Sequence, residues 1–203
     1  MNSVVFESEN VIPSKVVCIA RNYVAHIEEL KNEVPSEMSL FMKPNSAVSS
    51  RLLLPKFGEC HYEGEITFLI KDSKFAGVGF GLDLTLRDIQ SKLKEKGLPW
   101  EKAKAFDKAA VFSEFVKFDK NINNLGIELY INGQLKQKGD VGLMIYKPDE
   151  ILKEAMKYFT FCDYDLLMSG TPKGVGKFQK GDKFRGRILY NETVLVEKEW
   201  IVE

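Results

Sequence analysis

The chain has 203 residues, of which 44% are hydrophobic, and its 29 basic residues balance its 29 acidic ones. That size and apolar content predict a single folded domain over residues 1–203. The zero net charge argues against nucleic acid as a partner, and no apolar run reaches the roughly 20 residues of a membrane-spanning helix.

The first residues of the chain and its cysteines indicate the cellular compartment in which we expect the protein. The first residues, MNSVVFESENVIPSK, lack the basic start and apolar middle of a signal peptide. The three cysteines, Cys18, Cys60 and Cys162, are odd in number and widely spaced, so they form neither a disulfide framework nor a C-x-x-C motif. We expect free thiols and a cytoplasmic protein.

Three strands are predicted in the first half of the chain. Lys15–Ala20, KVVCIA, is a short β-branched apolar run that is typical of a buried strand. Residues 61–70, HYEGEITFLI, and residues 78–84, VGFGLDL, have the composition of two more strands.

Two amphipathic helices are predicted. Thr85 is placed to cap the first, with Asp88 three residues later as its reciprocal partner, and Gly97 with Pro99 ends that helix. Its apolar stripe consists of Leu86, Ile89 and Leu93. The second helix covers residues 148–159 and places on its inner side Ile151, Leu152, Ala155, Met156 and Phe159.

Hairpins dominate the second half. Asn132-Gly133 is the strongest short hairpin signal in the chain, and the alternating residues after Asp182 predict another hairpin around Tyr190-Asn191. Strands outnumber helices and do not alternate with them, which argues against a parallel doubly wound sheet. The predicted fold is a β-rich mixed α/β fold.

A Glu-x-Glu pair lies in the second predicted strand. Because side chains alternate along a strand, Glu63 and Glu65 project from the same face. Most such pairs belong to solvated strand faces. Here the same face continues to Thr67 and Leu69, so it is not uniformly polar.

A third acidic residue ends the next predicted strand. Asp83 shares its face with Gly79 and Gly81, and these two positions leave room beside the carboxylate. Carboxylates brought together repel one another unless a cation neutralises them, and oxygen-only ligands select Mg²⁺ or Mn²⁺. A surface cluster without metal remains the alternative.

His26 and Glu29 are three residues apart in ARNYVAHIEEL, where a helical turn would bring their side chains together. A carboxylate beside a histidine orients the ring and raises its basicity, as a general base requires. An ordinary surface pair is the alternative. His61, the other histidine, is equally compatible with a supporting role beside the carboxylates and with plain packing.

A glycine-rich segment, SGTPKGVGKFQKGD, follows the apolar run YDLLM. Its glycines would allow backbone N–H groups to approach an anion, although no Gly-Lys-Ser/Thr ends it as in a P-loop. A tight turn at a strand end explains the glycines equally well.

Together these segments resemble the fumarylacetoacetate hydrolase family, most closely its small acylpyruvases and oxaloacetate decarboxylases. The resemblance runs through most of the chain, in the family's order. The segments that carry it are ARNYVAHIEEL, LFMKP, HYEGE, LDLTLRDIQ, KGLPWEKAKAFD, INGQLKQ and SGTPKGVG.

The resemblance implies a β-roll fold with a few short helices, and a role for each site residue. The implied metal ligands, for Mg²⁺ or Mn²⁺, are Glu63, Glu65 and Asp83. The implied catalytic residues are His26, Glu29 and Lys104. The implied substrate-binding residues are Arg21, Arg87, Gln90, Lys104 and Thr171.

The resemblance also implies a lid between His26 and Lys43, a homodimer, and a small keto acid as substrate. The segment between Ile70 and Leu82 is shorter than in typical family members, which carry a helical insertion there. The implied reaction is hydrolysis or decarboxylation at a C–C bond of a pyruvyl-containing keto acid. Isomerisation or hydration of 2-hydroxydienoates, and a binding module without catalysis, remain the alternatives.

Overall fold

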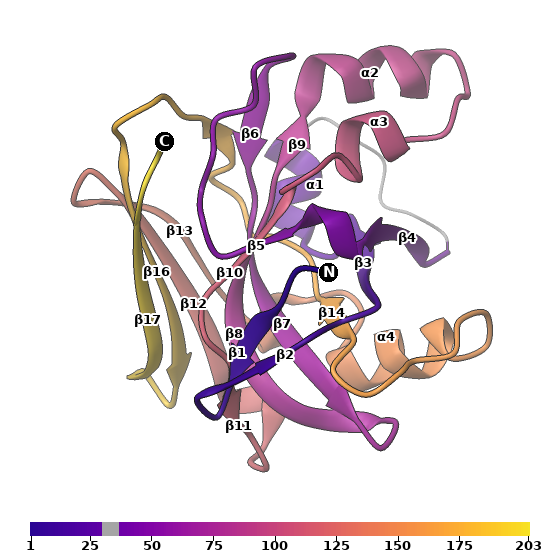
Figure 1. The fold of residues 1–203 in the computed structure, drawn as a ribbon, viewed down its shortest axis with the longest axis vertical. Coiled ribbons are helices and arrows are strands. Elements are labelled where there is room, and N and C mark those ends of the chain that lie inside the picture. The colour runs from indigo at the N-terminus through magenta and orange to yellow at the C-terminus, as the bar shows by residue number, and fades with distance from the viewer. Residues whose placement is uncertain (30–36) are drawn as a thin grey trace.

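The computed structural model describes residues 1–29 and 37–203. Strands predominate and the helices are few and short, as the sequence predicted. Figure 1 shows a large curled sheet in the centre, a second sheet beside it, and two short helices above the ends of the strands.

The largest sheet has the strand order β4-β3-β14-β7-β8-β10-β5, with β11 also paired to β8. β14 pairs with β3 and β10 with β5 in parallel, and their other neighbours are antiparallel, so the sheet is not doubly wound. Its strands are β3 (Lys15–Ala20), β4 (Ser39–Pro44), β5 (Val48–Ser49), β7 (Gly64–Lys71), β8 (Lys74–Asp83), β10 (Ala110–Phe112), β11 (Val116–Lys117) and β14 (Leu166–Met168).

The β7–β8 hairpin forms the middle of this sheet. β8 begins at Lys74, four residues before the predicted start, and a turn at Asp72-Ser73 joins it to β7. The segment between Ile70 and Leu82 is therefore a hairpin with a tight turn, without a helix of its own.

A four-stranded antiparallel sheet packs against β7 and β8. Its order is β13 (Gln134–Asp140), β12 (Leu125–Ile131), β16 (Lys183–Tyr190) and β17 (Thr193–Ile201). The Asn132-Gly133 turn is confirmed, with positive φ at both residues. The second turn occupies Asn191-Glu192, one residue later than predicted. The two sheets meet in the core, where the rings of Phe80 and Trp200 lie 5.9 Å apart.

Two small sheets complete the fold: β1 (Val4–Phe6) with β2 (Glu9–Val11), and β15 (Gly176–Lys177) with β6 (Cys60–Tyr62) and β9 (Thr85–Leu86). The prediction of one strand over residues 61–70 is wrong at Glu63. That residue separates β6 from β7, which belong to different sheets, and its carbonyl oxygen accepts a hydrogen bond of 2.8 Å from the backbone N–H of Asp83. Glu63 thus lies at the junction of two sheets.

The α-helices are α1 (Val24–Glu29), α2 (Arg87–Glu95), α3 (Glu101–Lys104) and α4 (Pro148–Ala155). Short 3₁₀ turns occur at Asn45–Ala47, Ile122–Asn124 and Val141–Leu143. Among the described residues, every helix is too short or too polar to traverse a lipid bilayer. All three cysteines are unpaired, as predicted.

Two details of the predicted helices are wrong. Thr85 does not cap α2, because it lies in β9 and Leu86 occupies the capping position without a side-chain hydrogen bond. Asp88 instead accepts a hydrogen bond of 2.8 Å from the backbone N–H of Glu59. The second helix ends at Ala155, and the side chain of Met156 is exposed.

A buried carboxylate connects the parallel strands β3 and β14. Asp165, just before β14, accepts hydrogen bonds from the backbone N–H groups of Ser14, Lys15 and Cys162 at 2.8, 3.1 and 2.8 Å. The Ser14 hydroxyl donates at 2.7 Å, and the Lys15 ammonium forms an ion pair. Burial raises the pKa of Asp165, but the hydrogen bonds from Lys15 and Ser14 outweigh burial and hold the pKa below its ordinary value.

We expect Asp165→Asn to lower the free energy of unfolding by about 3 kcal/mol, because an uncharged amide leaves the Lys15 ammonium unpaired and offers fewer acceptors. The carboxylate's contribution is complete above the unfolded pKa of about 3.9 and is lost as the pH falls through the lower folded pKa. Urea denaturation at pH 7 and pH 3 should show a difference in the free energy of unfolding between wild type and Asp165→Asn, and this difference should be smaller at pH 3. Asp119→Asn, at an exposed position, serves as the control; an equal loss in both variants would contradict the assignment.

Candidate active site

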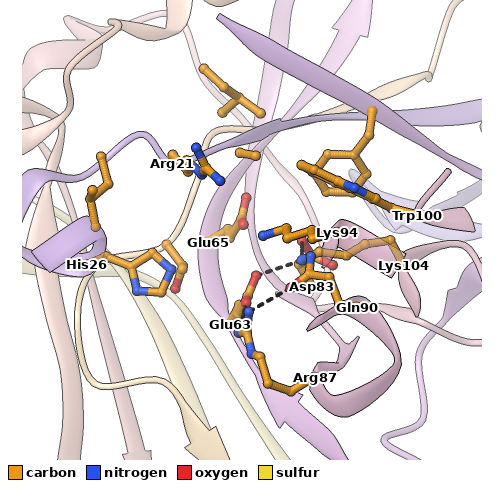
Figure 2. Close-up of a pocket in the computed structure, with 15 residues that line it drawn as sticks. Arg21, His26, Glu63, Glu65, Asp83, Arg87, Gln90, Lys94, Trp100 and Lys104 are labelled. Atoms are coloured by element: carbon orange, nitrogen blue, oxygen red, sulfur yellow. Dashed lines mark hydrogen bonds and ion pairs between the residues drawn. The ribbon is translucent and has the colours of Figure 1, made fainter. Parts of the chain in front are cut away.

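A cavity of about 460 Å³, including its open mouth, lies where α1, α2 and α3 cover the ends of β3, β7 and β8. Apart from Glu29, every site residue predicted from the sequence lines it. Those residues are Arg21, His26, Glu63, Glu65, Asp83, Arg87, Gln90, Lys104 and Thr171. Figure 2 shows the acidic side chains in the middle, with Arg21 and His26 on one side and Lys94 and Trp100 on the other.

The three acidic residues form one buried cluster. Glu63 is 5% exposed, and Glu65 and Asp83 are each 1% exposed. Each offers a carboxylate oxygen, and these oxygens lie within 4.8 Å of one another. A solvated strand face is therefore excluded as the explanation of the Glu-x-Glu pair.

The glycines beside Asp83 do not leave space for a ligand, so that prediction is wrong. A methyl carbon added at Gly81 would lie 2.4 Å from the Thr67 hydroxyl, and one added at Gly79 would lie 2.9 Å from the Phe115 ring. These glycines allow close packing of the sheet below the cluster.

Cationic side chains neutralise two of the three carboxylates. The Lys104 ammonium donates to Glu63 at 2.8 Å and to Asp83 at 2.6 Å, and Arg87 pairs with the other oxygen of Glu63. Lys43, whose role was not predicted, is fully buried and lies 2.7 Å from Asp83. Burial raises the pKa of Glu63, but Lys104 and Arg87 outweigh burial and lower it.

Glu65 differs from its neighbours, because among residues 1–29 and 37–203 no cationic side chain pairs with it. The one hydrogen bond to its carboxylate within that part of the chain comes from the backbone N–H of Gly170, at 2.7 Å. Burial, together with the charges of Asp83 and Glu63, raises its pKa well above the ordinary value. A cation at this point would relieve that repulsion, and three carboxylate oxygens are the donor set that hard divalent ions prefer. The residues present therefore fit a metal ion.

The predicted histidine pair is brought together. Nδ1 of the buried His26 lies 3.2 Å from the Glu29 carboxylate, which leaves Nε2 for a ligand. Glu29 is held in turn by the backbone N–H of Gly174, at 3.0 Å. Only glycine fits there, because φ is +102° and a Cβ atom would lie 2.0 Å from the carbonyl oxygen of Lys136. The glycine-rich loop thus does direct N–H groups at anions, namely the chain's own Glu65 and Glu29.

The predicted substrate-binding residues differ in how firmly they are held. Arg87 donates to Gln90 at 2.9 Å, and the hydroxyl of Thr171 accepts from Gln137 at 2.8 Å. Arg21 follows β3 with a left-handed φ of 59°, and its buried Nε has no hydrogen-bond partner within the described chain. A strained backbone and an unpaired donor are typical of ligand sites.

Six residues that line the cavity were not predicted as site residues: Ile19, Ala20, Ile27, Phe41, Lys94 and Trp100. The signal for Lys94 was available, because it follows Gln90 by four residues and Arg87 by seven, which places all three on one side of a helix. His61 pairs with Glu59 at 2.9 Å and does not line the cavity. Residues 30–36 of the predicted lid lie outside the described residues.

Residues 15–197 match the family model described as the C-terminal domain of fumarylacetoacetate (FAA) hydrolase. The chain belongs to the fumarylacetoacetate hydrolase family. The resemblance and the fold inferred from the sequence are thereby confirmed.

Two curated relatives of this chain are both named oxaloacetate tautomerase. Oxaloacetate tautomerase YcgM of Escherichia coli (strain K12) is 40% identical over 188 residues, which cover 84% of this chain and 86% of the relative. The human mitochondrial oxaloacetate tautomerase FAHD1 is 34% identical over 202 residues, covering 90% and 91%. Among solved structures, fumarylpyruvate hydrolase from Pseudomonas aeruginosa, in complex with Mn²⁺ and pyruvate, has a TM-score of 0.89 and 28% identity, covering 99% of this chain and 95% of that one.

We expect Glu65→Ala to abolish stoichiometric Mn²⁺ binding and to leave the fold intact, since removing one buried carboxylate also removes repulsion. Calorimetric titration should show about one site in the wild-type protein and none in the variant, with similar far-UV circular dichroism. Glu59→Ala, which removes a carboxylate outside the cluster, should bind Mn²⁺ normally. Undiminished Mn²⁺ affinity in Glu65→Ala would remove this residue from the ligand set.

Proposed function

We propose that this protein is a Mg²⁺- or Mn²⁺-dependent enzyme that interconverts the keto and enol forms of oxaloacetate or a similar small pyruvyl keto acid. The observation that carries the proposal is the buried carboxylate of Glu65, which lies within 4.8 Å of two others and has no cationic partner among residues 1–29 and 37–203. His26, whose Nδ1 contacts Glu29, lines the same cavity. The name of the 40% identical relative supports oxaloacetate as the substrate. Tautomerisation goes beyond the hydrolysis, decarboxylation and dienoate isomerisation inferred from the sequence.

The reaction needs negative charge on the keto oxygen to be stabilised while a proton moves at C3. A bound divalent cation supplies Lewis-acid stabilisation of that charge. The Glu63, Glu65 and Asp83 carboxylates would hold the cation. Lys104 and Arg21 would bind the substrate anion. His26, oriented by Glu29, would take the proton from C3 or return it there through Nε2.

Acylpyruvate hydrolysis is a second candidate, and the His26–Glu29 contact of 3.2 Å favours it. The same histidine could deprotonate a water molecule that attacks the distal carbonyl group. Cleavage would then release the pyruvyl part with the same charge on its keto oxygen. Decarboxylation of oxaloacetate produces that charge as well, but it requires no attacking water. One site could therefore support all three reactions to different extents.

Wild-type protein should accelerate the decay of enol-oxaloacetate, followed by its ultraviolet absorbance, in the presence of Mg²⁺ but not after chelation. No acceleration above buffer with saturating Mg²⁺ or Mn²⁺ would contradict the proposed function. Parallel assays with acetylpyruvate and with dienoate acids would then show whether another reaction takes its place.

His26→Ala should separate the reactions. Losing a general base typically lowers a rate by about 10²–10⁴-fold, so we expect losses of that order in tautomerisation and acetylpyruvate hydrolysis. Decarboxylation should fall far less, because the three carboxylates and the cations of the site remain. His61→Ala, at the histidine outside the cavity, is the matched control. Equal large losses in all three reactions, at unchanged Mn²⁺ affinity, would show that His26 serves a step common to them.

We propose a homodimer, as the family resemblance implies. The edge strands β13 and β17 support this, because Leu135 on β13 and Val194 and Ile201 on β17 are 48%, 45% and 61% exposed. Unpaired strand edges and exposed apolar side chains favour association.

Sedimentation velocity at micromolar concentration should therefore give one species of twice the chain's mass. Introducing a charge at the exposed apolar position, with Ile201→Lys, should weaken the dimer, whereas Thr193→Lys, at an exposed polar position of the same strand, should not. A species of one chain's mass in the wild-type protein would refute the dimer.

A further inference from the structure

One side of α2 faces the cavity with polar side chains. Arg87, Gln90 and Lys94 are spaced by three and four residues, and all three line the cavity. Arg87 and Gln90 are bonded to each other, and Arg87 is also paired with Glu63. Lys94 is the third residue of this stripe, and it differs from the other two in its contacts.

Within residues 1–29 and 37–203, Lys94 forms no ion pair and no side-chain hydrogen bond. Its ammonium group lies 4.7 Å from the centre of the Trp100 ring, a cation–π contact that supports the side chain without neutralising its charge. Figure 2 shows Lys94 and Trp100 entering the cavity together, with the amine extended toward the carboxylates. The ammonium group is thus held in place and remains available to a ligand.

The surroundings of Lys94 are positively charged. Burial, followed by the charges of Arg21, Lys104 and Arg87, lowers its pKa to about 8, although Glu63 opposes the shift. Lys104 and Arg87 are already engaged by the acidic cluster. Lys94 therefore lies in the cavity without a direct carboxylate partner among the described residues, and the carboxylate of a bound anion would supply one.

The chemistry of the proposed substrates indicates which anion this is. All pyruvyl keto acids share a carboxylate next to a keto group, and that end belongs at the acidic cluster with its cation. The substrates differ at the far end, which is a carboxylate in a dicarboxylic keto acid and uncharged in acetylpyruvate. A cation outside the cluster can distinguish these two classes.

We propose that Lys94 binds the distal carboxylate of a dicarboxylic 2-oxo acid and thereby selects such substrates over pyruvyl compounds with an uncharged far end. This inference rests on the proposed function for the position of the pyruvyl end. It makes Lys94 a specificity residue of the site. Removing its charge should change the choice among ligands and leave the chemistry at the pyruvyl end intact.

The test uses two ligands that do not react, S-malate and S-lactate, which share a 2-hydroxy acid end and differ in the distal carboxylate. Binding of each to the Mg²⁺-loaded full chain is measured by calorimetry, directly or by competition. We expect wild-type protein to favour malate by about 10-fold or more, the range for a hydrogen bond to a charged group. Lys94→Met should bring malate to the affinity of lactate, while lactate affinity changes by less than about 2-fold.

Two variants control the comparison. Lys92→Met removes an exposed lysine from the same helix and should keep the preference for malate, and Lys94→Arg should keep most of it because the charge is retained. A preference that survives in Lys94→Met would overturn the inference, as would a wild-type protein without any preference. Equal weakening of both ligands would assign Lys94 a structural role on Trp100 instead.

Kinetics provides a second readout. In Lys94→Met, kcat/KM for oxaloacetate should fall by about 10-fold or more through KM, with kcat/KM for acetylpyruvate nearly unchanged. The binding experiment requires no turnover, so a failure of the specificity role of Lys94 can be distinguished from a failure of the proposed function. Loss of the malate preference in Lys94→Met would support the specificity role even if oxaloacetate were not a substrate.

Discussion

The site depends on one constraint, which is that three carboxylates are buried within 4.8 Å of one another and their charge must be compensated. Burying an unpaired carboxylate costs several kcal/mol. The compensating groups come from different parts of the chain: Lys43 from β4, Lys104 from α3 and Arg87 from α2. The two helices must therefore dock over the ends of β7 and β8, and β4 must lie in the same sheet. The charge of the cluster is therefore compensated only when the surrounding elements are correctly arranged.

The glycine-rich loop joins the cluster to the histidine pair. Its Gly170 N–H bonds to Glu65, and its Gly174 N–H bonds to Glu29, which lies beside His26. Neutral backbone donors can hold carboxylates without competing for the charge of a cation. A shift of this loop would move a carboxylate of the cluster and the partner of the histidine together. The glycine-rich loop consequently helps to position both the acidic cluster and the His26–Glu29 pair.

The sequence was sufficient for the parts of the fold and site that local patterns determine. The two hairpins followed from turn chemistry, although one turn lies a residue later than predicted, and nine of the residues indicated by the family resemblance line one cavity. The break at Glu63 could not be predicted, because it depends on β6 and β7 pairing in different sheets. The packing against Gly79 and Gly81 also depends on side chains distant in the sequence. Thr85 failed as a helix cap for a related reason: its hydroxyl lies in β9 and accepts a hydrogen bond of 2.6 Å from Lys104.

The cations around the cavity fall into two groups: those paired with the acidic cluster, and those without a carboxylate partner in the described chain. Lys43, Lys104 and Arg87 are paired with the acidic cluster, which we propose holds the cation and the pyruvyl end of the substrate. Arg21 and Lys94 have no such partner in the described chain, and both line the cavity. Since tautomerisation, decarboxylation and hydrolysis all place negative charge on the same keto oxygen, the paired group cannot determine which reaction occurs. In our proposal that choice depends on Lys94, which would bind the far end of the substrate, and on His26, which would act at C3 or on a water molecule.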